Sequence, residues 1–241
     1  MVERVVVAMS GGVDSTTAAA LLLEQGYEVI GVSLKVWDGK GSASIRRTCC
    51  SLDDFRDAGR AAQLIGIPHY VANMVEVFRA EVVDYFAAEY LRGRTPNPCI
   101  VCNSRIKFHA LIRLARQIGA NRVATGHYAI VEHMPGQRPR LRKGLDGLKE
   151  QSYFLFNLAA DQLDSALFPL GGYRKDEVRR MARDRGLHVA EKPESQEICF
   201  VPNNDYAAFI RQRVGPAAFK GGDILTADGC VIGRHRGIPF Y

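Results

Sequence analysis

The chain has 241 residues, of which 47% are hydrophobic and 24% charged, and its formal net charge is +6. This balance allows one buried core, in a large domain or in a domain with a smaller addition. Because no apolar run reaches the roughly 18 residues of a membrane helix and the first residues show no targeting pattern, we expect a cytoplasmic protein without membrane contact.

The first half of the chain alternates strand and helix patterns. Residues 4–9 are β-branched and apolar, residues 16–25 form an apolar helix pattern, and residues 27–37 alternate like a strand. The alternation continues with a helix at 52–65, a strand at 69–72, a helix at 75–91, a loop at 92–103, a helix at 106–118 and a strand at 122–124. This order predicts an α/β fold with a doubly wound parallel sheet.

Beyond residue 130 the pattern becomes mixed. We predict a basic hairpin at 130–145, helices at 155–167 and 175–185, an extended segment at 189–202 and a hairpin at 222–238. We therefore expect a nucleotide-binding domain over residues 1–145, a middle region over 146–215 and the start of a β domain over 216–241.

The turn after the first strand has a sequence suited to phosphate. Residues 10–15 read Ser-Gly-Gly-Val-Asp-Ser and lie directly before a helix, so glycine backbone N–H groups and the helix N-terminus can meet an anion. The turn lacks the Lys-Ser/Thr ending of a Walker A loop. It resembles the PP-loop of the ATP pyrophosphatase superfamily, which implies ATP binding, with Asp14 helping to hold Mg²⁺; the alternative is a glycine-rich turn that only caps the helix.

Further motifs follow in order along nearly the whole chain. They are Thr-Pro-Asn-Pro-Cys-Ile-Val-Cys-Asn at 95–103, Ile-Lys-Phe at 106–108, Ala-Thr-Gly-His-Tyr at 124–128, Gln-Ser-Tyr-Phe-Leu at 151–155 and Ser-Gln-Glu-Ile-Cys-Phe at 195–200. Together they resemble the tRNA 2-thiouridylase family. That resemblance implies a PP-loop domain, a middle tRNA-binding region and a C-terminal β-barrel, of which we expect this chain to hold only the start.

The resemblance also implies roles for single residues. The positions that match ATP contacts are Ala8, Met9, Ser10, Gly11, Gly12, Val13, Asp14, Ser15, Leu34 and Gly126. The positions that match tRNA contacts are Asn97, Pro98, Cys99, Lys149, Glu150 and Gln151. Cys102 matches the first catalytic cysteine, and Cys199 matches the cysteine that receives persulfide sulfur.

The implied reaction explains the need for ATP and two thiols. Adenylation turns the C2 oxygen of the wobble uridine into a leaving group, and sulfur from Cys199 replaces it. Cys102 then closes a disulfide with Cys199, so the implied partners are tRNA, a persulfide donor or relay protein, and a reductant. A thiolate is the reacting form, and Arg105 and Lys107 are the nearby cations that could favour it at Cys102.

Several alternatives stay open at this point. Cys99, Cys102 and Cys199 together could hold a [4Fe–4S] cluster in place of the persulfide route, which the motifs favour, whereas zinc lacks a fourth ligand. Another ATP-dependent PP-loop synthetase and an RNA-binding protein without catalysis are rival functions. Cys49, Cys50 and Cys230 are interpreted as small, partly buried residues, and His127 as either a ligand contact or a structural hydrogen-bonding group.

Overall fold

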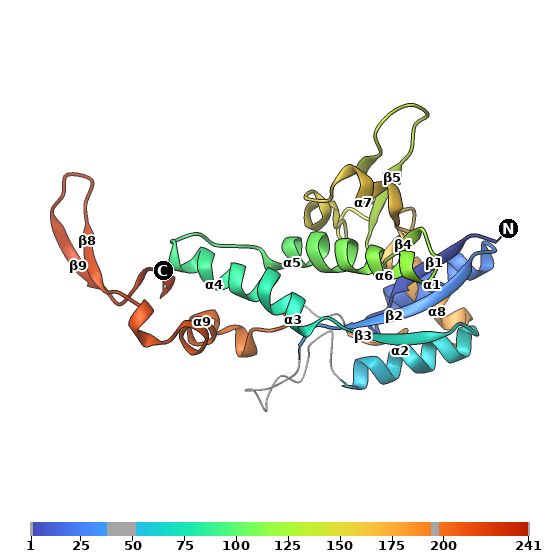
Figure 1. Cartoon of the computed structure of the whole chain (residues 1–241), viewed down its shortest axis with the longest axis horizontal. Coiled ribbons are helices and arrows are strands. Elements are labelled where there is room, and N and C mark those ends of the chain that lie inside the picture. The colour runs from blue at the N-terminus through green and yellow to red at the C-terminus, as the bar shows by residue number, and fades with distance from the viewer. Residues whose placement is uncertain (1, 38–51, 194–197, 241) are drawn as a thin grey trace.

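The computed structural model describes residues 2–37, 52–193 and 198–240, and its centre is a five-stranded sheet (Figure 1). In spatial order the strands are β3 (His69–Asn73), β2 (Glu28–Lys35), β1 (Arg4–Ala8), β4 (Arg122–Ala124) and β7 (Ala166–Leu167). All four pairings are parallel. The chain order reverses between β1 and β4, so the loops that follow these two strands meet at the carboxyl edge, where α/β sheets bind ligands.

The core explains why β1 is a run of valines. Val6 packs to one side with Phe108 and Leu111, whereas Val5 and Val7 pack to the other. Alternate residues of a strand point to opposite faces, so a strand covered on both faces is apolar throughout. The predicted doubly wound α/β sheet is thereby confirmed.

Helices cover both faces of the sheet. They are α1 (Val13–Glu24) and α2 (Leu52–Ile65) on one face, α6 (Leu111–Gln117) on the other, and α8 (Lys175–Asp184), which packs on the outside of α1. Because α1 lies between the sheet and α8, it is apolar around most of its circumference.

Two long helical runs extend from the sheet. The first comprises α3 (Val75–Phe78), the π-helical η1 (Arg79–Val83) and α4 (Asp84–Leu91); the second comprises α5 (Pro98–Val101), the π-helical η2 (Cys102–Ala110) and α6. The prediction of a loop as far as residue 103 was wrong. Asn97 accepts a hydrogen bond from the Cys99 N–H and Pro98 occupies the first turn, so the second run begins at Pro98.

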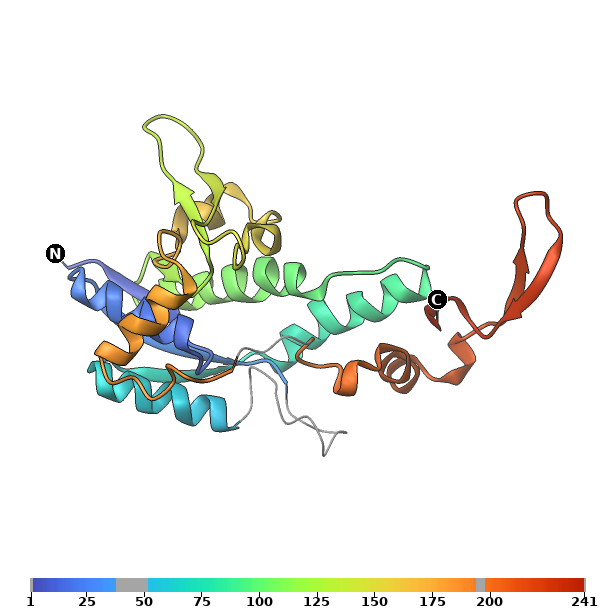
Figure 2. The ribbon, with the colours of Figure 1, turned by 180° about the vertical axis from the view of Figure 1, so that it is seen from behind.

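A second hydrophobic cluster, which we call the aromatic cluster, joins these runs to α9 (Tyr206–Val214). The rings of Phe78, Phe86, Phe200 and Phe209 pack at centroid distances between 5.3 and 6.4 Å. Figures 1 and 2 both show α3, α4 and α9 side by side, away from α1 and α8. The sequence did not predict α9.

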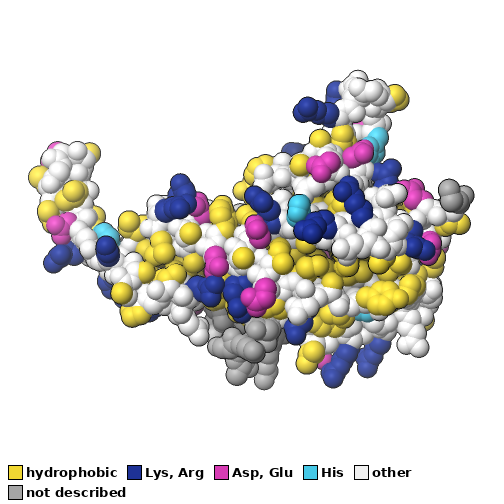
Figure 3. Space-filling model, in the orientation of Figure 1, with side chains coloured by type: hydrophobic (Ala, Val, Ile, Leu, Met, Phe, Trp, Pro, Cys, Tyr) yellow, Lys and Arg dark blue, Asp and Glu magenta, His cyan; other side chains and the backbone are white. Residues whose placement is uncertain are grey.

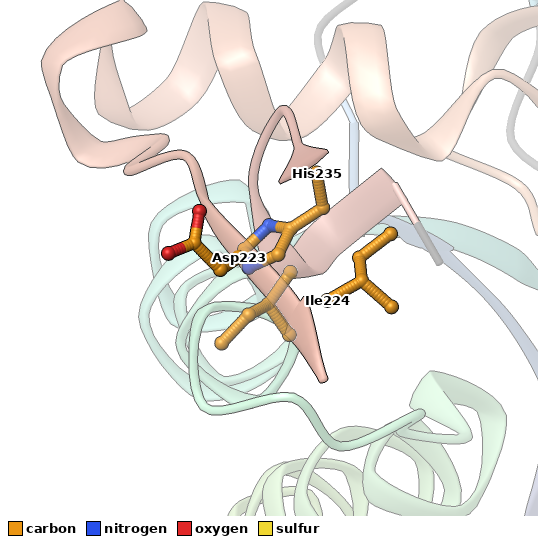
Figure 4. Close-up of a pocket in the computed structure, with 4 residues that line it drawn as sticks. Asp223, Ile224 and His235 are labelled. Carbon is orange, nitrogen blue, oxygen red and sulfur yellow. The ribbon is translucent and has the colours of Figure 1, made fainter. Parts of the chain in front are cut away.

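Two antiparallel hairpins stand out from the molecule at well-separated places (Figures 1 and 2). They are β5 (Ala129–Glu132) with β6 (Arg140–Lys143), and β8 (Gly222–Leu225) with β9 (Val231–His235), and both were predicted. A pocket beside the second hairpin is lined by Asp223, Ile224, His235 and Ile238 (Figure 4). This pocket lies at the opposite end of the molecule from β1 and α1 (Figure 1), so it is separate from the carboxyl edge of the sheet.

The segment after the first hairpin differs from the predicted helix at 155–167. It contains η3 (Ser152–Leu155), α7 (Ala160–Ser165) and β7, which pairs with β4. A strand from the predicted middle region thus completes the sheet, and the division into three regions stays a prediction. The remaining short helical turns are η4 (Pro202–Asn204), η5 (Pro216–Ala218) and η6 (Ile238–Phe240). Within the described ranges, none of the helices has both the length and the apolar composition that a bilayer crossing requires.

Candidate active site

The phosphate loop, residues 9–12, connects β1 to α1 at the carboxyl edge of the sheet. The Ser10 N–H donates to Ser15 Oγ at 3.1 Å, and Ser15 Oγ donates to the Gly12 carbonyl at 3.2 Å. Gly11 has a φ of +70°, and a Cβ there would lie 2.2 Å from the Asp54 carbonyl oxygen. The turn is therefore held by its own serines and requires glycine at its tightest point.

Residues at the ends of the predicted ATP stretch belong to the core. Met9 and Val13 are buried, and Ala8 packs against the cluster that contains Phe108. Leu34, near the end of β2, packs between the sheet core and the aromatic cluster. The side chains of these residues pack in the hydrophobic core and so anchor the two ends of the loop.

Asp14 is the charged centre of the loop. Lys175 Nζ contacts its two carboxylate oxygens at 2.8 and 2.7 Å, and the Tyr128 hydroxyl donates to Oδ1 at 2.8 Å. The Lys175 side chain is only 11% exposed. In the sequence, Lys175 lies among other cations directly after a Gly-Gly-Tyr-Arg turn, and no pattern there indicates a contact with Asp14.

Gly126, at the end of β4, touches the same loop. A Cβ at this position would lie 2.7 Å from the Asp14 carbonyl carbon and 2.7 Å from the Ser15 nitrogen. The structure thus brings Gly126 against residues 14 and 15, at the point where the strand order reverses.

His127 follows Gly126 directly, and its imidazole is hydrogen-bonded to Thr125 in the same segment after β4. Its Nδ1 is 2.7 Å from Thr125 Oγ1. Burial holds the pKa of His127 well below its ordinary value of 6.5, and the positive charge of Lys107 lowers it further. The imidazole is therefore neutral at neutral pH.

Lys192 makes a second contact with the phosphate loop that the sequence did not suggest. Its Nζ donates to the Gly11 carbonyl at 3.0 Å and to Asp54 and Asp57 of α2 at 2.7 and 2.6 Å. Burial lowers the pKa of Lys192, but hydrogen bonds to the two carboxylates outweigh that effect and the pKa lies above its ordinary value.

The cysteines of the predicted site lie along the second helical run and near the aromatic cluster. Cys99 is exposed on α5, whereas Cys102, at the start of η2, and Cys199 are partly buried. Although far apart in sequence, Cys102 and Cys199 both pack against the aromatic cluster. The positions 49, 50 and 195–197 lie outside the described residues, and Cys230 is exposed on the far hairpin.

The described residues contain no group of three or more His, Cys, Asp or Glu side chains that could hold a metal ion. The [4Fe–4S] alternative at Cys99, Cys102 and Cys199 therefore stays a prediction. Mg²⁺ is bound in proteins by one or two carboxylates together with substrate phosphates, and Asp14 is the carboxylate beside the phosphate loop. In this structure Lys175 contacts both of its oxygens.

Gln151, in the predicted tRNA-contacting tripeptide, is hydrogen-bonded to Tyr128. Gln151 exchanges hydrogen bonds with Tyr128: its N–H donates to the Tyr128 carbonyl at 3.0 Å, and its Oε1 accepts from the Tyr128 N–H at 3.1 Å. Lys149 and Glu150 are half-buried beside it. The tripeptide is thus attached to the residue that also holds Asp14.

Basic and aromatic side chains surround this region. Figure 3 shows Lys and Arg side chains on the β5–β6 hairpin and along the band below it. Tyr153 and Phe156 are 61% and 64% exposed, and η3 contacts both β6 and α5. Exposed rings next to cations are typical of surfaces that bind unpaired nucleotides.

Known proteins resemble the chain in sequence and in fold. Residues 3–203 match the family described as tRNA methyl transferase HUP domain. The protein named tRNA-specific 2-thiouridylase MnmA from Heliobacterium modesticaldum is 52% identical over 242 residues, covering 100% of this chain and 63% of the relative. The protein of the same name from Geotalea uraniireducens is 54% identical over 243 residues, covering 99% of this chain and 64% of the relative.

Two solved structures share the fold at 17% sequence identity and a TM-score of 0.50. An NMN synthetase from Francisella tularensis matches over 80% of this chain and 66% of its own. A 4-thiouridine synthetase, solved as an RNA complex with bound ATP, matches over 88% of this chain and 50% of its own. The chain spans less than two thirds of the length of the two curated relatives, and by the match over residues 3–203 it belongs to the tRNA methyl transferase HUP domain family.

Proposed function

We propose that the chain is the catalytic part of a tRNA 2-thiouridylase, which uses ATP to replace the C2 oxygen of the wobble uridine with sulfur. The observation that carries the proposal is the packing of Cys102 and Cys199 against one aromatic cluster, in a fold whose phosphate loop lies at the switch point of the sheet. The names of the curated relatives support the substrate and the product.

The phosphate loop supplies the nucleotide half of the reaction. Backbone N–H groups at the start of α1 and the ammonium of Lys175 meet the phosphates of ATP, and Gly126 lets β4 approach the loop. Mg²⁺ bound with the triphosphate through Asp14 would neutralise charge on the phosphates. The uridine oxygen then attacks the α-phosphorus, and the bond to the β-phosphate oxygen breaks, which gives an adenylated uridine and pyrophosphate.

The cysteines supply the sulfur half. A persulfide donor first loads Cys199, whose terminal sulfur attacks C2 of the adenylated uridine and expels AMP. The Cys102 thiolate then attacks the Cys199 sulfur, which releases 2-thiouridine and leaves a Cys102–Cys199 disulfide. A dithiol reductant returns two electrons and two protons to that disulfide before the next cycle.

The RNA would approach over the β5–β6 hairpin and α5. Cations on β6 meet the phosphate backbone, and the exposed rings of Tyr153 and Phe156 offer stacking faces to unpaired bases. Asn97, Pro98 and Cys99 begin the helix that leads to Cys102, so this segment supports a role in holding the target base.

Single-turnover thiolation tests the proposal. The chain, unmodified tRNA, ATP, Mg²⁺ and a persulfide donor are mixed, and 2-thiouridine is measured by mass spectrometry of nucleosides. Cys199→Ser and Cys102→Ser are expected to yield no 2-thiouridine, whereas Cys230→Ser, on the far hairpin, keeps the yield of the unchanged chain. Full product from Cys199→Ser would contradict the sulfur relay and favour an ATP-dependent synthetase that needs no thiol.

The cluster alternative is tested on the same samples. Anaerobic purification followed by iron and acid-labile sulfide analysis is expected to give substoichiometric iron in thiolating protein. Stoichiometric iron that is lost together with activity would replace the persulfide route with a cluster route.

A further inference from the structure

Two residues connect the phosphate loop to the segment that carries three of the predicted tRNA contacts, residues 146–151, which we call the tripeptide segment. The Tyr128 hydroxyl and the Lys175 ammonium both donate to the Asp14 carboxylate. With their backbones the same two residues bond to opposite ends of the tripeptide segment. A carboxylate of the nucleotide site and a segment expected to meet RNA therefore belong to one hydrogen-bonded unit.

The connection through Tyr128 is short and buried. Its hydroxyl lies 2.8 Å from Asp14 Oδ1, and the residue is 2% exposed. Its backbone exchanges two hydrogen bonds with Gln151, at 3.0 and 3.1 Å. A Cβ built on Gly144, just before the segment, would lie 2.7 Å from the Tyr128 carbonyl oxygen, so the chain packs closely against this residue. A shift of the tripeptide segment therefore moves the residue that holds Asp14.

The connection through Lys175 uses a carboxylate that caps two elements. Asp146 Oδ2 accepts from the Lys175 N–H at 2.9 Å, at the start of α8, and its Oδ1 accepts from the Leu148 N–H at 3.0 Å. The Asp146 carbonyl also accepts from the Lys149 N–H at 3.1 Å. The hydrogen bond from the Lys175 N–H is the main cause that holds the pKa of Asp146 below its ordinary value of 3.8, so the cap is a charged acceptor at neutral pH.

The turn between these two attachments is open to solvent. Leu148 is 95% exposed, whereas the Lys175 side chain is 11% exposed. A macromolecule can therefore touch the tripeptide segment, while the bonds that tie it to Asp14 are shielded from water. Hydrogen bonds in such a low-dielectric setting are stronger than the same bonds in water.

We propose that Tyr128 and Asp146 are positioning residues that couple two ligands, so that nucleotide bound at the phosphate loop and RNA bound at the tripeptide segment each raise the affinity for the other. The inference rests on the proposed function. Either ligand fixes part of the hydrogen-bonded unit, so the second ligand has fewer groups to order when it binds. By linkage, the two affinities rise by the same factor, which we call the coupling factor.

Paired affinity measurements test the coupling. tRNA binding to the unchanged chain is measured by filter binding at one salt concentration, with and without saturating non-hydrolysable ATP analogue and Mg²⁺. Binding of the analogue is measured by calorimetry with and without tRNA. We expect a coupling factor of about fivefold or more, as is usual for coupled sites. This ratio is the readout because it does not change when a variant merely binds one ligand more weakly.

Two substitutions break the two connections. Tyr128→Phe removes the hydroxyl bond to Asp14 and leaves the backbone bonds to the tripeptide segment, so the coupling factor is expected to fall. Combined with Asp146→Ala, which removes the shared cap, it is expected to bring the coupling factor close to one.

Two matched controls make the same chemical changes elsewhere. Tyr173→Phe removes a hydroxyl from a residue packed against the hydrophobic cluster that contains Tyr128. Asp205→Ala removes the side-chain cap of α9. Both variants are expected to keep the full coupling factor. All variants are compared at a temperature at which circular dichroism shows them folded.

Hydrogen exchange measures the connection without RNA. The N–H groups of Leu148, Lys149 and Gln151 are hydrogen-bonded within the unit, so their exchange rates show how firmly the tripeptide segment is held. In the unchanged chain, the analogue with Mg²⁺ is expected to slow exchange in peptides that cover this segment. In the double variant, the analogue should leave that exchange unchanged.

The outcomes distinguish this inference from the function on which it rests. If the unchanged chain binds no ATP analogue or no tRNA, the proposed function fails together with the inference. If it binds both with a coupling factor of one, or if the double variant keeps the full factor, the coupling is rejected and the nucleotide site stands. An equal loss of the factor in the two control variants would also reject it.

Discussion

At the scale of single residues, β4 approaches the phosphate loop closely because Gly126 has no side chain. Gly126 leaves no room for a Cβ, which would meet backbone atoms of residues 14 and 15 at 2.7 Å. We expect Gly126→Ala to lower the free energy of unfolding by about 1–3 kcal/mol, as overpacking does, and to weaken ATP binding because α1 must move away from β4. Urea denaturation and calorimetry with ATP measure the two effects.

Gly172→Ala is the matched control for that substitution. Gly172 is exposed and has nothing within 4 Å of a built Cβ, so the alanine should be accepted with unchanged ATP affinity. Equal ATP affinities for the two alanine variants would mean that the contact between β4 and the loop plays no part in binding.

Two partly buried histidines make stability depend on pH. Burial lowers the pKa of His69 and, more strongly, of His127 below the ordinary 6.5. Below pH 6.5 the unfolded chain therefore binds protons that the folded chain does not, so the free energy of unfolding falls as the pH decreases. Above pH 6.5 this contribution is fully present. His127→Gln is expected to reduce the loss of stability between pH 7 and pH 5, measured by urea denaturation, whereas His109→Gln, at an exposed position, leaves the slope unchanged.

Lys175 is expected to matter for stability even without a ligand. It holds both carboxylate oxygens of Asp14 at a site where its own side chain is 11% exposed. Lys175→Met should lower the free energy of unfolding by about 2 kcal/mol, the loss expected for a charged hydrogen bond. Arg234→Met, which breaks the exposed pair with Asp223, should have almost no effect. Equal unfolding midpoints for the two variants would show that the Asp14 pair is not stabilising.

At the scale of elements, the β5–β6 hairpin is the part of the fold best placed to meet an RNA backbone. Its second strand, β6, has the sequence Arg-Leu-Arg-Lys and is largely exposed. The double variant Arg140→Ala with Lys143→Ala should weaken tRNA binding and lower the slope of log K against log salt by about 1–2, because fewer counterions are released. Filter binding at several salt concentrations measures the slope.

Arg56→Ala is the control, because it removes a positive charge from α2, on the other side of the sheet from the β5–β6 hairpin. It should leave the salt slope unchanged. The same decrease in slope for both variants would indicate binding by net charge without a defined surface.

The elements that the sequence predicted well have a strong local pattern. Residues 52–65 and 122–124 were predicted with the bounds that α2 and β4 have, because one has a helical apolar stripe and the other follows a Gly-Ala-Asn turn. The errors came from tertiary context. β7 is a strand of two residues that exists only because β4 pairs with it, and the start of α5 depends on an Asn cap beside two prolines.

At the scale of the whole molecule, burial is very uneven. Val5, Val6 and Val7 of β1 are fully buried, whereas Leu225, Val231 and Ile232 of the far hairpin are 57–66% exposed. We expect amide hydrogen exchange to be fast in β8 and β9 and slowest in β1 and β2. Mass spectrometry of peptic peptides measures the order, and slow exchange in β8–β9 at low protein concentration would show that the hairpin is held more firmly than its burial indicates.

The parts of the candidate site that lie in short sequence motifs could be predicted from the sequence. The contacts between segments far apart in the chain could not. The loop at 10–15 and the cysteines lie in recognisable motifs. The residues that contact the loop lie in no such motif. Lys175 contacts Asp14 across a sequence separation of 161 residues, and Lys192 contacts Gly11 across 181 residues. No periodicity or composition distinguishes these two lysines from the other cations of the chain.

Those separations have a consequence for synthesis on the ribosome. The loop emerges from the exit tunnel among the first residues, but the cations that hold Asp14 and the Gly11 carbonyl are made only after most of the chain has been translated. A nascent chain halted before residue 175 therefore has the glycine-rich turn without its ammonium partners. ATP binding by the nascent chain should therefore begin late in translation, after Lys175 and Lys192 have left the tunnel.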